Sequence, residues 1–367
     1  MIIRTDDILD ACKFLKAMTS KSANNVLSGL IQIKADGKQF SLHMSDGIYD
    51  LIYKTDCTDV FNCTISADLF LDLIPKISSE TIEFSMKDTN LILSGSGKYK
   101  FPAVYDSREM IEIKTIDIEN VTNSWTVSGD SLYSIYVYNT KQMAFKDWKS
   151  PVQKLFYLDK EGAITFTRGA VVNDFDLGAD IKVALQDATV KFFSFTKGND
   201  VDVEFGYTSV NGVAQPRMKF TMGNFIATYI LPITDKILSQ IPEAKIRERA
   251  HNNYDSSIVL DSLQIRDILD RLSIFMDDKQ IIDFAFNGSR LQMKTTNDRI
   301  LEDVYLTNSV SEPTEFKIDM KYFRSAIQSD YGKHFNMLFS QNDPAVVINF
   351  GNIYHVIPKL TNAEIQD

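Results

Sequence analysis

Residues 281–297, IIDFAFNGSRLQMKTTN, predict a β-hairpin, and this hairpin decides the fold of the chain. Apolar residues alternate with polar ones on both sides of Asn287-Gly288, as in two half-buried strands. Asn-Gly is typical of a two-residue hairpin turn, because both residues adopt a positive φ readily. The same pattern occurs twice earlier, in residues 29–46 and in residues 154–169. A repeated hairpin indicates a repeated domain.

The turn glycines of the three hairpins set the period of the repeat. Gly37, Gly162 and Gly288 are spaced by about 125 residues, the length of one domain. Prolines close the last strand of each repeat, at Pro102, Pro232 and Pro358. We therefore predict three domains at residues 1–120, 121–250 and 251–360, followed by a polar tail at residues 361–367.

Each repeat is expected to carry two helices on an antiparallel sheet, which makes the chain an α+β protein. Apolar residues at helical spacing, with Ser, Thr or Asp before them, locate the helices. Residues 129–143 also contain YSIYVY, which fits a strand equally well. A charged run at residues 243–249 is expected to be the linker between the second and third repeats. The predicted helices span residues 5–19, 66–77, 129–143, 184–195, 261–272 and 320–330.

Composition and motifs exclude several classes of protein. The chain has no apolar run long enough to cross a membrane and no signal peptide at its N-terminus. Its three cysteines form no C-x-x-C and are expected to be reduced thiols. We find no nucleophile–base set, phosphate-binding loop or metal-ligand spacing, so neither an enzyme nor a cofactor is expected. Ser94-Gly95-Ser96-Gly97 and Asp277-Asp278 are interpreted as turns.

Several short sequence segments, in order along the chain, resemble segments of the bacterial sliding clamp, the beta subunit of the replicative DNA polymerase. The resemblance covers roughly residues 1–360. It is carried by residues 26–37 (VLSGLIQIKADG), 64–70 (TISADLF), 97–101 (GKYKF), 319–322 (DMKY) and 354–360 (YHVIPKL). The resemblance implies a DNA-clamp ring formed by a head-to-tail homodimer, with helices lining the hole. It also implies double-stranded DNA, a DNA polymerase and a clamp loader as partners, a processivity role without catalysis, and a cytoplasmic location in a bacterial or infected host cell.

The net charge of −10 does not argue against this reading, because cations gathered on one face bind DNA whatever the total charge. The resemblance places Lys21, Lys146 and Lys149 at DNA-contacting positions. Helix placement alone adds further cations. These are Lys13, Lys16, Lys141, Lys197, Arg266 and Arg324. Each of these cations could instead be an ordinary solvated side chain.

The resemblance also implies a subunit interface with opposite charges around an apolar centre. One side is expected to hold Leu69, Leu73, Lys98, Lys100 and Phe101. The other side is expected to hold Ile274, Phe275, Asp298, Glu302 and Asp303. Leu69 and Leu73 could equally be core residues.

A groove for partner peptides is the third implied site, and here the chain departs from the family. The family's TDGHRL corresponds to TRGAVV at residues 167–172, which keeps threonine and glycine but not histidine and arginine. We hypothesise a divergent clamp, encoded by a virus or plasmid, with an altered peptide preference. The expected groove residues are Pro151, Thr167, Gly169, Val171, Val172, Tyr322, Ile357 and Pro358.

Two other functions compete with this reading. A clamp-like scaffold that stays monomeric and binds proteins, not DNA, would share the same repeats. A β-rich structural protein would not need the paired helices of each repeat. The mass in solution separates a ring from a monomeric scaffold.

Overall fold

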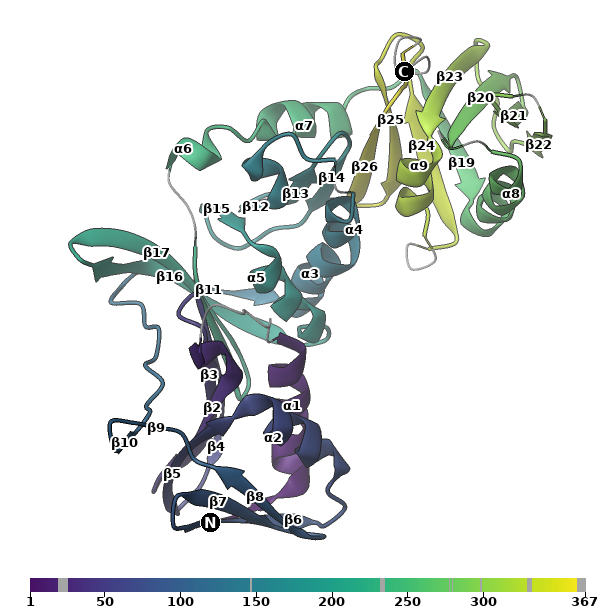
Figure 1. Ribbon diagram of the computed structural model, residues 1–367. Helices are drawn as coiled ribbons and strands as arrows, with labels where there is room; N and C mark the ends of the chain where they lie inside the picture. The colour runs from purple at the N-terminus through teal and green to yellow at the C-terminus, as the bar shows by residue number, and fades with distance from the viewer. Residues whose placement is uncertain are drawn as a thin grey trace. The chain divides into compact units, whose positions relative to one another are not determined.

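The computed structural model describes residues 1–18, 26–145, 147–231, 235–276, 278, 280–297, 299–328 and 332–361 (Figure 1). The chain divides into two compact units. Unit 1 comprises Met1–Tyr133 and Ala188–Pro232, and unit 2 comprises Ser134–Asp187 and Ile233–Asp367. Every strand pairing within the described residues is antiparallel, and each unit is considered separately below.

Unit 1 contains one eight-stranded sheet, one four-stranded sheet and a small hairpin. The large sheet has the order β11-β16-β17-β18-β4-β3-β2-β5, and the smaller one β1-β6-β7-β8. Its strands are β1 (Ile2–Arg4), β2 (Leu30–Asp36), β3 (Gln39–Ser45), β4 (Tyr49–Asp56), β5 (Val60–Ser66), β6 (Thr81–Lys87), β7 (Asn90–Ser94), β8 (Lys98–Pro102), β9 (Tyr105–Asp106), β10 (Glu109–Met110), β11 (Asn120–Ser128), β16 (Asp200–Val210), β17 (Val213–Met222) and β18 (Phe225–Ile230).

Unit 2 repeats this plan with a large sheet in the order β15-β12-β13-β14-β26-β25-β24-β19 and a small one in the order β22-β21-β20-β23. Its strands are β12 (Phe156–Asp159), β13 (Gly162–Phe166), β14 (Ala170–Asp174), β15 (Lys182–Leu185), β19 (Ser256–Asp261), β20 (Ile281–Asn287), β21 (Arg290–Thr295), β22 (Leu301–Tyr305), β23 (Thr314–Asp319), β24 (His334–Phe339), β25 (Ala345–Phe350) and β26 (Ile353–Pro358).

The helices are short and amphipathic. Asp261 caps α8 by accepting hydrogen bonds from two backbone N–H groups, and Asp319 caps α9 in the same way with one. The stretch 129–143 is helical throughout, with a π-helical segment (Ile135–Asn139) between α3 and α4, so the strand alternative is wrong. The helices are α1 (Thr5–Met18), α2 (Ala67–Leu73), α3 (Gly129–Ser134), α4 (Thr140–Met143), α5 (Asp187–Phe192), α6 (Asp235–Leu238), α7 (Glu243–Ala250), α8 (Ser262–Ile274) and α9 (Met320–Ala326).

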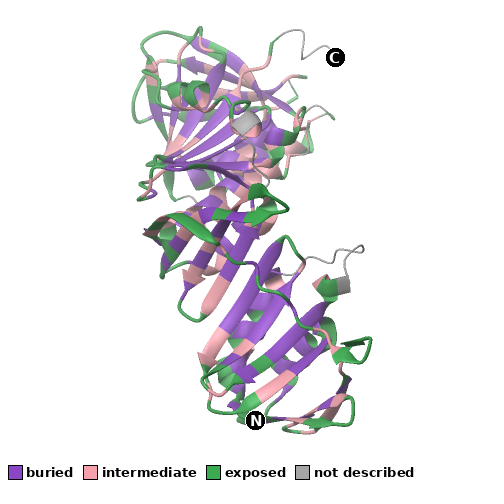
Figure 2. Ribbon diagram, turned by 90° about the vertical axis from the view of Figure 1, so that its left-hand side faces the viewer, coloured by how far each residue is buried: buried purple, intermediate pink, exposed green. Residues whose placement is uncertain are grey.

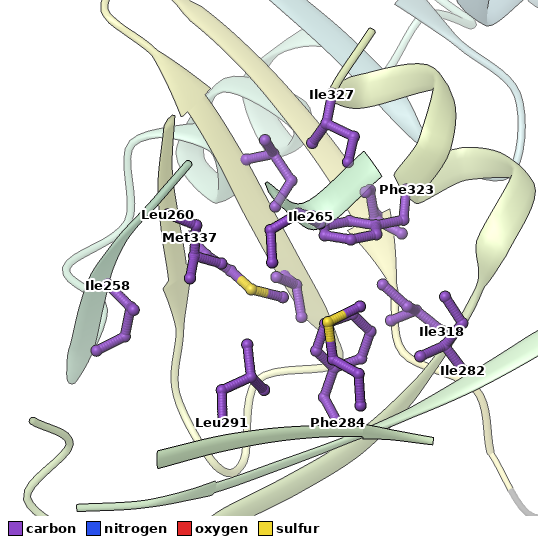
Figure 3. Close-up of a cluster of buried hydrophobic side chains, with 14 of the residues drawn as sticks. Ile258, Leu260, Ile265, Ile282, Phe284, Leu291, Ile318, Phe323, Ile327 and Met337 are labelled. Carbon is purple, nitrogen blue, oxygen red and sulfur yellow. The ribbon is translucent and has the colours of Figure 1, made fainter. Parts of the chain in front are cut away.

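The three hairpins predicted from the sequence are present, as β2–β3, β12–β13 and β20–β21. Their turn glycines Gly37, Gly162 and Gly288 have φ of 87°, 121° and 59°, a region that favours glycine. In the third hairpin, Phe284 and Leu291 point into a core with Ile265 of α8 and Phe323 of α9 (Figure 3). The alternation of apolar and polar residues in this hairpin therefore predicts correctly which face of the strands is buried.

Buried residues are concentrated along the strands, and exposed residues on the loops (Figure 2). The core of the third repeat includes stacked phenylalanine rings, with Phe284 and Phe316 centred 5.5 Å apart. In unit 1, Phe14 of α1 packs edge-on against Phe192 of α5 at 5.9 Å. Phe14 also packs on Phe225 of β18 at 4.7 Å, and Phe284 packs on Phe323 of α9 at 5.2 Å. Aromatic contacts therefore hold α1 and α9 on their sheets.

Two secondary-structure predictions are wrong. Residues 243–249 form helix α7 and not a linker, because Ile246 and Ala250 pack into a core cluster of unit 2. Ala184 and Leu185 belong to strand β15, which pairs with β12, so the following helix begins only at Asp187. The described part of the chain contains no helix long and apolar enough to cross a membrane.

Candidate functional site

Helix α1, which packs beside α2, carries the first group of predicted DNA-binding cations. Lys13 and Lys16 are exposed on α1, as a phosphate-contacting role requires. Both are already paired with carboxylates: Lys13 Nζ lies 3.1 Å from Asp10 Oδ1, and Lys16 donates to Asp72 of α2. The two helices together contain five aspartates against two lysines. This helical surface is therefore less basic than the resemblance implies.

Helices α8 and α9 present a second pair of predicted cations. Arg324 of α9 lies 3.0 Å from Asp270 Oδ1 of α8 and donates to the Leu269 carbonyl. Arg266 is half-buried and donates from Nε to the Ser262 carbonyl at 3.1 Å. These helices contain two aspartates against four cations, so their charge is moderately positive.

The remaining predicted cations have different environments. Lys149 and Lys197 are exposed, and Lys197 Nζ lies 5.2 Å from the centre of the Tyr133 ring. The Nζ atom of Lys141 is buried; burial of His355, with a smaller contribution from the nearby charge of Lys141, lowers the pKa of His355 to about 3. In this conformation Lys141 does not present its amino group to a ligand, a departure from the expectation. Lys21 and Lys146 lie outside the described residues.

A cavity of about 500 Å³ lies in unit 2 between α7, the β13–β14 connection and the end of β26. Its apolar lining includes Phe166, Ile246 and Val356. Exposed Lys245 and Arg249 border it, and within the described residues neither makes an ion pair. Gly169 approaches the chain closely there, because a Cβ at this position would lie 2.8 Å from the Val356 carbonyl. The result is an open groove with an apolar floor and a border that mixes three cations (Arg168, Lys245 and Arg249) with two carboxylates (Glu248 and Asp343).

Helix α7 is held in place by a nearly buried arginine. Arg247 lies 2.7 Å from Asp159, 3.0 Å from Asp174 and 3.4 Å from Glu161, and its side chain is 11% exposed. His251 Nε2 is 3.1 Å from the other oxygen of Asp174. Burial raises the pKa of Asp174, while His251 and Arg247 oppose that shift. The ion-pair network therefore fixes one wall of the groove.

Three of the eight predicted groove residues line this cavity: Thr167, Gly169 and Pro358. Val171 and Val172 are buried in strand β14, so they do not line it. Tyr322 and Ile357 also belong to the core, where Tyr322 donates a hydrogen bond to Asp147 and packs on Phe145. Pro151 is exposed but lies outside the cavity lining. Four of these five residues are buried in the core, which the sequence alone does not reveal, and Pro151 is exposed elsewhere.

Two edge strands carry the predicted subunit interface. Strand β8 ends the small sheet of unit 1, and β22 ends the small sheet of unit 2, so each has one unpaired side. Their burial patterns are identical, with only the fourth residue buried. Ile274 is 75% exposed and Phe275 is 41% exposed, so two adjacent large apolar side chains are available for a contact at the end of α8.

Other predicted interface residues divide between the surface and the core. Leu69, Lys98 and Lys100 are exposed and Leu73 is half-buried. Phe101 is buried and packs against Phe70 at 6.3 Å, so it supports β8 from inside and does not reach the surface.

The acidic side of the predicted interface is already paired within the subunit. Arg271 binds Glu302 through two nitrogens at 2.7 and 3.0 Å, and Arg290 binds Asp303 at 2.8 Å. Each arginine lowers the pKa of its partner carboxyl. Asp298 lies outside the described residues.

Sequence reasoning missed the contribution of α7 to the groove. The signal was present: Ile246 and Ala250 are four residues apart, and the run begins with glutamate and ends with arginines, as suits a helix dipole. The carboxylate partners Asp72 and Asp270 were also missed, because they come from a second helix distant in sequence. Within the described residues, no group of three or more His, Cys, Asp or Glu is arranged to hold a metal ion.

Comparisons with known proteins agree with the sequence resemblance. Residues 1–123 match the family described as DNA polymerase III beta subunit, N-terminal domain. No curated protein sequence matches the chain at a significant level. The fold is similar to a sliding clamp (DNA polymerase III subunit beta) from Pseudomonas aeruginosa bound to griselimycin, with a TM-score of 0.79, 11% identity, and coverage of 98% of this chain and 99% of that one.

Two further structures give the same result. A putative DNA polymerase III beta subunit from Eubacterium rectale has a TM-score of 0.75 and 14% identity. The beta subunit from Borrelia burgdorferi, in complex with a natural product, has a TM-score of 0.75 and 12% identity. Both cover 98% of this chain and 99% of their own. The predicted α+β class and the likeness to the bacterial sliding-clamp fold are thus confirmed, at sequence identities of 11% to 14%.

Proposed function

We propose that this chain, which has the bacterial sliding-clamp fold over 98% of its length, is a DNA sliding clamp. Two copies form a ring that encircles double-stranded DNA and tethers a DNA polymerase and other partners to it. We divide the chain into clamp domains at residues 1–120, 121–250 and 251–360 and assign it to the cytoplasm. The full-length fold match, together with the family match of residues 1–123, carries the proposal.

The role of such a ring is mechanical and not catalytic. Contacts between helix cations and phosphates read no base sequence, and they weaken as salt rises. Lys13, Lys16, Lys149, Lys197 and Arg324 lie on accessible or half-accessible positions that suit such contacts. Retention on DNA then depends on closure of the ring more than on any single contact.

Closure is proposed to join β8 of one copy to β22 of the other. Both strands have an unpaired edge, and Lys98 and Lys100 on β8 complement Glu302 and Asp303 on β22. Ile274 and Phe275 supply exposed apolar surface beside this contact. Head-to-tail use of two different edges closes into a ring when the rotation between copies is a half turn.

The groove beside α7 is proposed to hold short peptide segments of the polymerase and the clamp loader. Its apolar floor favours apolar side chains, and Lys245 and Arg249 at its border favour a nearby carboxylate. A library of random heptapeptides is selected for binding to the wild-type protein, which identifies ligands without assuming a partner. We expect Ile246→Arg to lose them and Val213→Arg, on an exposed hairpin in unit 1, to keep them. Selected peptides that bind both variants equally would refute the groove assignment.

Retention on DNA tests the ring itself. Protein mixed with nicked circular plasmid is cross-linked by carbodiimide, which joins neighbouring lysines and carboxylates, and is then passed through a sizing column at high salt. We expect co-elution with circles and release after the plasmid is cut once. Loss from both forms, or equal binding to both, would contradict encirclement.

A monomeric scaffold is the second candidate. It is favoured by the arginines that already neutralise Glu302 and Asp303 within the subunit. Light scattering after size exclusion decides between the two: a mass near twice 41.7 kDa supports the ring, and 41.7 kDa at all concentrations supports the scaffold.

A further inference from the structure

The helices that the proposed ring turns towards DNA carry carboxylates bound to the very cations that would contact phosphate. Lys16 of α1 donates to Asp72 of α2, and Arg324 of α9 lies 3.0 Å from Asp270 of α8. The arrangement thus occurs in both units, and each time it links the two helices of one repeat. In both cases the carboxylate is more than half exposed, so it stays near any phosphate that approaches the cation.

Helix composition reinforces the local pairing. Across α1, α2, α8 and α9 there are seven aspartates and six lysines or arginines. A helical surface of this composition has no excess of positive charge to concentrate DNA. Exposed ion pairs are individually weak, so a phosphate can displace the carboxylate from its cation. It cannot displace the negative charge itself, which still repels the phosphate over a distance of several ångströms.

We infer that Asp72 and Asp270 compete with DNA phosphates for Lys16 and Arg324 and thereby keep the direct affinity of the ring for DNA low. This inference rests on the proposed function. The consequence is that retention depends on ring closure, and that few phosphate contacts add to the salt dependence of binding. Low affinity also lets the ring slide, because each contact exchanges easily between neighbouring phosphates.

The test removes the two carboxylates and leaves the cations. A linear 30-base-pair duplex threads through the ring from its ends, and its equilibrium binding is followed by fluorescence anisotropy. The double variant Asp72→Asn with Asp270→Asn is compared with Asp56→Asn with Asp255→Asn. The control changes the net charge equally, on a strand and a loop, and not on the helices.

We expect the helix variant to bind roughly 16-fold more tightly near 0.1 M salt, at about twofold for each of the four exchanges in a dimer. Its salt dependence should steepen by about 3 to 4 in log–log slope, at roughly 0.9 for each added phosphate contact. Unchanged binding, or an equal gain in the control pair, overturns the inference.

A double-mutant cycle guards against indirect effects. Lys16→Gln with Arg324→Gln should change wild-type binding little, because those cations are already paired, but should abolish the gain in the double-asparagine background. A gain that persists without the two cations also overturns the inference. Failure of wild-type protein to stay on circular plasmid refutes the proposed function instead, so the two failures are distinguishable.

Discussion

Arg247→Ala is expected to loosen helix α7 and destabilise unit 2 by about 2–3 kcal/mol at neutral pH. Breaking a buried ion pair from one side costs about 3–5 kcal/mol, because the remaining charge stays buried without its partner. Arg247 and Asp159 are nearly buried, with side chains 11% and 9% exposed. We discount the value because Glu161 is well exposed and Asp174 keeps its contact with His251.

The loss should depend on pH in a definite direction. Burial raises the pKa of Asp174 in the folded chain, so its ionised form carries a penalty that is present above the folded pKa. That penalty disappears as the pH falls below the unfolded value of about 3.8. Removing Arg247 removes a cation that opposes the shift and enlarges the penalty. The deficit of Arg247→Ala should therefore be largest at pH 7 and shrink towards pH 4.

Fluorescence measures unit 2 alone if Trp125→Phe is present in every variant. The chain has two tryptophans. Trp148, whose ring centre lies 4.3 Å from Lys154 Nζ, then reports on unit 2. We expect the urea midpoint to fall by about 1 M, for a slope of about 2–3 kcal/mol per molar. Lys245→Ala, on the same helix, should shift it little. A deficit that grows as the pH falls would refute the reasoning.

Other residues give three more predictions. Ile274→Asp should convert the dimer to a 41.7 kDa monomer in light scattering, since it places charge in the apolar centre of the proposed interface. Asp50→Ala should cost about 2–4 kcal/mol in unit 1, measured by Trp fluorescence in urea, because it leaves the buried His43 without the carboxylate 2.5 Å away. Iodoacetamide at pH 8 should label Cys57 but not Cys63, since burial shields Cys63 and raises its pKa to about 11.

Each of these has an internal control. Leu263→Asp, at another exposed apolar position of α8, should leave the dimer intact, and a monomeric control would indicate general disruption of that helix. Asp56→Ala should not destabilise unit 1, whereas an equal loss there would show that burial of Asp50 is irrelevant. In urea all three cysteines should react, and labelling of the buried Cys12 in the native protein would contradict the packing of α1.

The fold was largely predictable because its signals are local. Alternation around Gly37, Gly162 and Gly288 specifies both the turn and the buried face, and the structure has all three hairpins. Helix α7 was not predicted, because only Ile246 and Ala250 of its eight residues reach the core and the rest resemble a solvated linker. The helix predicted from residue 184 was wrong for a related reason. The three-residue apolar run of β15 has no periodicity of its own, and its conformation depends on pairing with β12.

The candidate site was only partly predictable. A phrase such as TRGAVV aligns residues in order, but it does not say which of them face inwards, and Val171 and Val172 proved to be core. Likewise a lysine on a helix is visible in the sequence, whereas its neutralising partner is not. Lys16 and Asp72 meet across 56 residues, so only the packing of α1 on α2 brings their charges together.

Each large sheet of this protein contains strands from two different repeats. Strand β18 of the second repeat bonds to β4 of the first, and β14 bonds to β26 of the third, so main-chain hydrogen bonds run across both boundaries. A single repeat therefore cannot be excised without breaking these hydrogen bonds. A fragment ending at residue 119 would leave one edge of β4 without its hydrogen-bond partner. An unpaired edge of this kind can pair with a strand of another molecule and promote aggregation. Cutting between repeats therefore adds new unpaired edges to the large sheets, beyond those that β8 and β22 already present at the ends of the small sheets.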